Sequence, residues 1–242
     1  MDSKDLMKEL AGFSTPTITN VVATYPSHPL CLHLYDPWVD NWHTDNTVRP
    51  MFPQLPPVAG HAVTCVIGLP DPSKPKCTVV DIMEALIASP QPTVFVYQQD
   101  FPPDVLPRSG LLGEIMMTAM SMLGCVGAIS NGPSRDIAEI GRLGIQFMLS
   151  GAVAGHGDIG IYAVNVPVTV AGMDVAPGDI VHMDINGAVK FPADKLGQVV
   201  EKARAMQEEE ESMLRELAKA KTPREVVTAL MSQAQYGDYH RK

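Results

Sequence analysis

The chain has 242 residues, a length that suits one large domain. Apolar residues make up 45% and charged residues 19%, which excludes wholesale disorder, a collagen-like repeat and a coiled-coil rod. The 27 acidic residues outnumber the 18 basic ones, and the basic residues are dispersed, so we do not expect nucleic acid to be a partner. A small anionic ligand held by one or two arginines is compatible with the formal net charge of −9.

No uninterrupted apolar run approaches the roughly 18–20 residues that a membrane-spanning helix needs. Residues 1–13 are acidic and amphipathic, unlike a secretion signal. Cys31, Cys65, Cys77 and Cys125 are far apart and form no C-x-x-C pair, which favours reduced, buried thiols over a zinc site or a disulfide framework. These features predict a cytoplasmic protein that does not bind membranes.

The first half of the chain predicts an irregular excursion followed by alternating strands and helices. Ser14-Thr15-Pro16 is typical of a helix start, so we expect a helix over 16–24. Residues 25–57 are rich in proline and aromatic side chains, which predicts an ordered excursion that packs on the body or on a neighbouring subunit. The other expected elements of this half are a strand at 58–67, a helix over 79–87, a strand at 92–97, a helix over 113–123 and a strand at 125–129.

The second half is expected to be richer in short strands. A short helix from 136 to about 142 and a strand at 145–149 precede a glycine-rich loop at 151–160. Short strands follow over 162–191, and an amphipathic helical tail begins at 194. We therefore predict an α/β fold built as a single domain over 1–242, with C-terminal helices within 194–242.

The helix over 113–123 and the strand after it bring three charged residues to one edge. The helix runs roughly 16 Å one way and the strand returns a similar distance, so the helix start and the strand end should meet. Glu114 then lies near Arg135 and Asp136. The backbone N–H groups of residues 113–116 and Arg135 are suited to hold a carboxylate. Asp136 is a hard oxygen donor suited to Mg²⁺ or Mn²⁺.

Other polar motifs carry a weaker functional signal. His156-Gly157-Asp158 lies in a glycine-rich stretch and lacks a third metal ligand at a readable spacing, so a flexible loop is the favoured interpretation. The cluster of Trp38, Trp42 and His43 is more typical of packing than of a site, although in an oligomer it could form the wall of one.

Taken together, these motifs resemble the RraA-like proteins, which include divalent-metal-dependent 4-hydroxy-4-methyl-2-oxoglutarate and 4-carboxy-4-hydroxy-2-oxoadipate aldolases. The resemblance spans about residues 55–215. The matching segments are Val58–Thr64, Gly113-Glu114, Gly124–Ile129, Asn131-Gly132, Arg135-Asp136, Pro167-Val168, Gly172, Val175–Val181, Asp184, Asn186-Gly187 and Pro192.

The resemblance implies a compact β/β/α sandwich that assembles into trimers or hexamers with active sites at subunit boundaries. Carried over by position, Asp136 would bind the metal, Arg135 would hold the oxo-acid substrate, and the backbone of Gly113, Glu114, Ile115 and Met116 would bind its carboxylate. Active aldolases of the family carry Asp where this chain has Glu114, at the same spacing from Arg-Asp. The acidic run at 208–211 lies about where the family offers a carboxylate to a neighbour's site.

Two functions follow from the resemblance. The first is a lyase that cleaves a 4-hydroxy-2-oxo acid or decarboxylates oxaloacetate to give pyruvate, with Mg²⁺ as cofactor and Glu114, Arg135 and Asp136 as catalytic residues. No lysine lies between Cys77 and Val189, which disfavours a Schiff-base mechanism within the central region. The alternative is a non-catalytic regulator that binds a partner enzyme. A lyase or hydrolase acting on a different acid is a third possibility, for which the 25–57 excursion is the sequence hint.

Overall fold

The computed structural model describes residues 3–23 and 28–231, which divide into two compact units. The first unit comprises the residues up to Thr15 together with Asn41–Leu196, and the second comprises Pro16–Asp40 together with the residues from Gly197 onward. No helix in the described ranges is long and apolar enough to cross a membrane.

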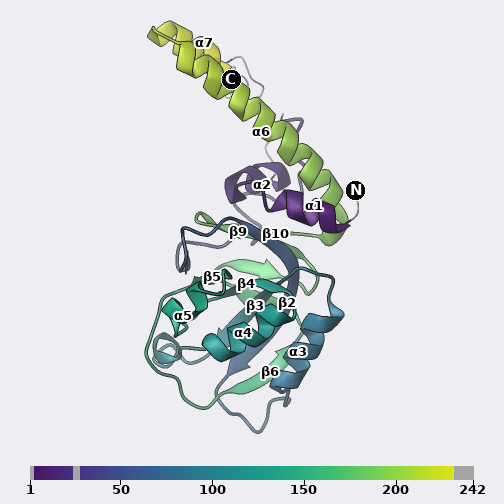
Figure 1. The fold of residues 1–242 in the computed structure, drawn as a ribbon, viewed down its shortest axis with the longest axis vertical. Coiled ribbons are helices and arrows are strands. Elements are labelled where there is room, and N and C mark those ends of the chain that lie inside the picture. The colour runs from purple at the N-terminus through teal and green to yellow at the C-terminus, as the bar shows by residue number, and fades with distance from the viewer. Residues whose placement is uncertain (1–2, 24–27, 232–242) are drawn as a thin grey trace. The chain divides into compact units, whose positions relative to one another are not determined.

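The first unit is built on one large mixed sheet (Figure 1). Its path is β1-β5-β4-β3-β2-β9-β10, and β6 also pairs with β2. β2, β3, β4 and β5 are parallel neighbours, whereas β6, β9 and β10 add antiparallel pairs. The strands are β1 (Arg49–Pro50), β2 (Val58–Gly68), β3 (Thr93–Asp100), β4 (Cys125–Ser130), β5 (Gln146–Leu149), β6 (Gly160–Val164), β9 (Ile180–Asp184) and β10 (Gly187–Phe191).

Three helices of the first unit cover one face of this sheet. The helices of this unit are α1 (Ser3–Leu10), α3 (Val79–Ala88), α4 (Glu114–Met122) and α5 (Ile137–Gly141), with short 3₁₀ turns η1 (Leu106–Arg108) and η2 (Ala193–Lys195). Apolar residues of α3, α4 and α5, such as Leu86, Met117 and Ile140, share one core with the strand residues Phe95 and Phe147. Their helical spacing is the reason these segments fold as amphipathic helices on the sheet.

A small hairpin covers the opposite face of the sheet. It consists of β7 (Val168–Val170) and β8 (Met173–Val175), which pair antiparallel. Val170 and Met173 pack with Val94 and Ile129 in a second core cluster. The unit is therefore a layered β/β/α arrangement, and the predicted α/β fold class is confirmed.

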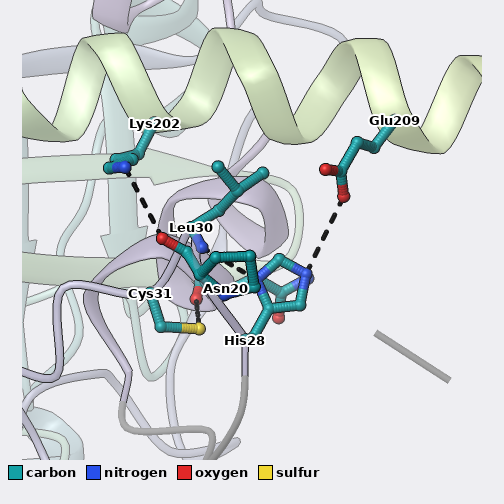
Figure 2. Close-up of polar contacts among 7 residues, drawn as sticks. Asn20, His28, Leu30, Cys31, Lys202 and Glu209 are labelled. Atoms are coloured by element: carbon teal, nitrogen blue, oxygen red, sulfur yellow. Dashed lines mark hydrogen bonds and ion pairs between the residues drawn. The ribbon is translucent and has the colours of Figure 1, made fainter. Parts of the chain in front are cut away.

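The second unit joins two distant parts of the chain. It contains α7 (Pro223–Met231) and all but the first residue of α2 (Thr15–Val22) and of α6 (Leu196–Lys219). The Nε2 atom of the buried His28 lies 3.9 Å from a carboxylate oxygen of Glu209, and Lys202 Nζ donates to the Pro29 carbonyl at 3.5 Å (Figure 2). Within the predicted acidic run at 208–211, Glu209 thus lies beside His28. Burial lowers the pKa of His28, and the nearby Glu209 offsets part of that shift.

The predicted excursion at 25–57 is divided between the two units. Residues 25–27 of it lie outside the described residues. Trp42, in the first unit, is buried and packs edge-on against His43, so packing is the role that the structure gives it. Trp38, in the second unit, is 94% exposed. The expected packing on the body is therefore observed for Trp42, whereas packing of Trp38 on a neighbouring subunit stays a prediction.

Candidate active site

Two neighbouring parallel strands bring two loops to one edge of the sheet. β3 and β4 run parallel, with Tyr97 paired to Ser130, so their carboxyl ends lie together. The loop after β4 is joined to the segment that leads into α4: Leu111 N–H donates to the Pro133 carbonyl at 3.3 Å, and the Ser134 hydroxyl donates to the Leu112 carbonyl at 3.1 Å. The start of α4 and the end of β4 therefore meet, as the sequence predicts.

Asp136 lies where these two segments meet, and its carboxylate contacts Glu114 and Arg135. It precedes α5 in a left-handed conformation, with φ of 57°. Its Oδ2 atom accepts a hydrogen bond from the backbone N–H of Glu114 at 3.1 Å, and Arg135 Nε lies 3.6 Å from the same oxygen. One carboxylate oxygen thus faces both a helix N-terminus and a guanidinium.

Gly113 makes this approach feasible. A Cβ atom built on Gly113 would lie 2.3 Å from Asp136 Oδ2 and 3.1 Å from Arg135 Nε. Any side chain at this position would therefore displace Asp136 from the helix start.

A surface hollow collects all the residues that the sequence predicts for the site. Gly113, Glu114, Ile115, Met116, Arg135, Asp136 and Glu139 line it. The side chains of Arg135 and Asp136 are 38% and 36% exposed, so a ligand from solvent can reach them. Glu139 is the lining residue that sequence reasoning missed. Its position in the short helix that directly follows Asp136 is the signal that could have placed it near the site.

One backbone N–H group at the start of α4 binds Asp136, and two others are available to a ligand in the hollow. We expected the N–H groups of residues 113–116 to be available to a substrate carboxylate, but that of Glu114 is bonded to Asp136. The N–H groups of Ile115 and Met116, in the first turn of the helix, have no hydrogen-bond partner among the described residues. These two donors and the Arg135 guanidinium can bind a small carboxylate together.

The carboxylates of the hollow suit a divalent cation that keeps water ligands better than one that is bound by protein ligands alone. Asp136, Glu114 and Glu139 present hard carboxylate oxygens to one hollow, which is the chemistry that Mg²⁺ prefers. In the part of the chain that the structure describes, no cluster of three or more His, Cys, Asp or Glu side chains could hold a metal ion. An ion held here would have to contact the protein through one or two carboxylates, such as that of Asp136, and keep its other ligands as water.

The His156-Gly157-Asp158 motif does not join this site. His156 Nδ1 lies 2.9 Å from the carbonyl oxygen of Gly157, within its own loop, and both His156 and Asp158 are exposed. Neither residue lines the hollow.

The fold and this site define a class of proteins, and comparison of the sequence with known families identifies that class. The family model described as RraA-like, Aldolase/RraA, matches residues 33–190, which include every residue of the hollow. The chain belongs to the RraA-like family.

Individual relatives are distant. A protein of Halalkalibacterium halodurans named "Putative 4-hydroxy-4-methyl-2-oxoglutarate aldolase" is 27% identical over 109 residues, which cover 45% of this chain and 52% of that protein. This chain thus spans about half the length of that relative. A solved but uncharacterized protein from Pseudomonas syringae pv. tomato matches with a TM-score of 0.73 at 19% identity, over 95% of this chain and 94% of that one.

A second solved structure carries the family name. Streptomyces coelicolor RraAS2, described as an unusual member of the RNase ES inhibitor RraA protein family, matches with a TM-score of 0.65 at 21% identity, over 86% of this chain and 94% of that one. At these identities the two solved structures establish the fold.

Proposed function

We propose that this protein is a metal-dependent lyase that acts on a small 2-oxo acid and releases pyruvate. The observation that carries the proposal is the hollow in which the first-turn N–H groups of α4, the Arg135 guanidinium and the Asp136 carboxylate converge. The distant relative named as an aldolase supports it.

Five of the seven residues that line the hollow have a role in this reaction. The N–H groups of Ile115 and Met116 bind the C1 carboxylate, and Arg135 stabilises the negative charge that develops on the 2-oxo oxygen. Asp136 would hold the divalent cation, for which Mg²⁺ is our proposal and Mn²⁺ the alternative. When bound, the cation supplies positive charge that strengthens the 2-oxo group as an electron acceptor.

Glu114 is the proposed proton carrier, because its side chain is exposed at the edge of the hollow. In aldol cleavage it accepts the C4 hydroxyl proton, directly or through one water, and the O–H electrons form the new carbonyl. The electrons of the C3–C4 bond pass to C3 and the 2-oxo group, and protonation at C3 yields pyruvate. With oxaloacetate, the bond that breaks releases the C4 carboxylate as CO₂.

The protein is further proposed to act as a homo-oligomer, either a trimer or a hexamer. On α4, Ile115 is 83% exposed and Met122 is 81% exposed, and their seven-residue spacing places them on one face of the helix. Apolar side chains this exposed beside a site favour coverage by another subunit.

The alternative function is a non-catalytic regulator that binds a partner enzyme through the same fold. One observation favours it: the fold matches a member of the RraA inhibitor family.

A coupled assay separates the two functions. Pyruvate release from a panel of 4-hydroxy-2-oxo acids and from oxaloacetate is measured with lactate dehydrogenase, once with Mg²⁺ and once with EDTA. The lyase predicts turnover of at least one acid that EDTA abolishes. The absence of chelator-sensitive turnover with every acid would favour the regulator.

A further inference from the structure

A buried glutamine outside the hollow contacts the loop that carries Arg135 and Asp136. Gln99 is 2% exposed and is the second-last residue of β3. Its backbone N–H donates to Asn131 Oδ1 at 2.7 Å, and Asn131 Nδ2 donates back to the Gln99 carbonyl at 3.0 Å. The Asn131 amide therefore continues the β3–β4 pairing beyond Ser130, where β4 ends.

The side chain of Gln99 fixes the next two residues of the same loop. Its Nε2 atom donates to the Pro133 carbonyl at 3.0 Å. A Cβ atom on Gly132 would lie 2.3 to 2.5 Å from the atoms of the Gln99 amide, so the amide packs directly against the glycine backbone. Gln99 thus holds residues 131–133, which directly precede Ser134, Arg135 and Asp136.

The Pro133 carbonyl connects the two segments that form the site, which are the loop after β4 and the segment that leads into α4. It accepts one hydrogen bond from Gln99 Nε2 and another from Leu111 N–H, in the segment that leads into α4. A displacement of Pro133 would therefore move the start of α4 and the Arg135-Asp136 pair at once. Ligand-binding groups must be held within about 0.5 Å of their productive geometry, so such a displacement is costly to function.

We propose that Gln99 is a positioning residue of this site: through its contacts with Asn131, Gly132 and Pro133 it sets the placement of Asp136 against the N-terminus of α4. The consequence for catalysis rests on the function proposed above, whereas the geometric consequence does not.

The test compares two buried glutamines at opposite ends of the sheet. Gln99→Met removes the amide but keeps the length of the side chain. The control is Gln146→Met: Gln146 is fully buried, and its Nε2 also donates to a carbonyl, that of Phe52, at 3.4 Å. Gln146 begins β5 and pairs with Gly127 near the start of β4, so it lies at the end of the sheet away from Asp136.

The first readout is the backbone N–H of Glu114, which reports the position of Asp136 whether or not the protein is an enzyme. Its hydrogen exchange is followed by NMR, with amides of β3 as an internal reference for overall stability. Gln99→Met should raise the Glu114 exchange rate at least tenfold relative to that reference, and Gln146→Met should change it less than twofold. Equal behaviour of the two variants would overturn the proposal.

The second readout is kinetic, with the acid that the wild-type protein turns over best. Gln99→Met should lower kcat/KM at least tenfold with most of the loss in kcat, while Gln146→Met stays within about twofold. A Gln99→Met enzyme within twofold of wild type would overturn the positioning role. A wild-type protein without turnover would instead contradict the proposed function and leave the exchange experiment decisive. If Gln99→Met does not fold, Gln99→Asn replaces it, because its shorter amide cannot reach Pro133.

Discussion

At the scale of single residues, the proposed function makes its most specific prediction for Glu114. Its carboxylate is exposed at the hollow while its own N–H is bonded to Asp136, so the side chain is available for proton transfer. Glu114→Gln should lower kcat by about 10²–10⁴ with a modest loss of metal affinity, the size expected when a general acid–base is removed. Glu114→Asp should retain or raise activity.

The control for Glu114→Gln is Glu84→Gln, which removes an exposed carboxylate from α3. Glu84→Gln should leave kcat unchanged. A Glu114→Gln enzyme with full kcat and a lowered melting temperature would assign Glu114 to helix stability instead of catalysis.

His182 makes the stability of the fold dependent on pH. Its buried ring lies 3.0 Å from the Thr15 hydroxyl and near Asp184, and burial lowers its pKa to about 4 from the usual 6.5. Between these values the unfolded chain binds a proton that the folded chain does not, so stability falls as the pH drops. The His182 contribution should make the protein about 2 kcal/mol less stable at pH 5 than at pH 8.

Urea unfolding at both pH values measures this loss. Burial also lowers the pKa of His28 and His61, so the total pH dependence includes their contributions in the same direction. The matched variant His182→Gln isolates one residue, because it should lose that part of the pH dependence. An unchanged dependence in His182→Gln would show that the His182 ring is not held neutral by the fold.

At the scale of elements, the start of α4 and the loop after β4 form one joint. Gly113→Ala tests it, because the added methyl group would meet Asp136 Oδ2. We expect metal-dependent turnover to fall at least tenfold. The control is Gly157→Ala, since a Cβ on Gly157 meets no atom within 4 Å. Equal kinetics for the two variants, measured with the same acid, would mean that the joint tolerates displacement.

The same joint shows what the sequence can predict and what it cannot. Helical and strand periodicity, with the reversal between 113–123 and 125–129, suffices to bring Glu114 and Asp136 together. The bond from the Glu114 N–H to Asp136 is not readable from sequence, because it depends on the left-handed conformation of Asp136. The role of Gln99 is equally hidden, because its partners follow a different strand and the side chain reaches them through tertiary contacts.

At the scale of the whole molecule, the pattern of helices and strands predicts the α/β class and the family resemblance implies the β/β/α layers, but neither predicts the division into two units. The second unit combines Pro16–Asp40 with the chain from Gly197 onward, and no local periodicity links segments that far apart. The family model ends at residue 190, so the helices α6 and α7 lie beyond the region it describes.

The oligomeric state is the property of the whole molecule that we predict. Light scattering on the purified protein should give at least three times the mass of one chain, because α4 exposes Ile115 and Met122 together. Met122→Glu should shift the protein toward smaller species, whereas Leu214→Glu, on an exposed position of α6, controls for the added charge. A wild-type monomer at micromolar concentration would contradict an assembly built on α4.

The most direct test of the proposed lyase is the chelator-sensitive turnover of Asp136→Asn. Asparagine keeps the size of the side chain, retains an acceptor for the Glu114 N–H and tolerates the left-handed conformation, but it lacks the charge that would hold the cation. The variant should melt within a few degrees of wild type and lose at least 10²-fold of the EDTA-sensitive pyruvate release. Release within a few-fold of wild type would contradict a metal-dependent site at Asp136.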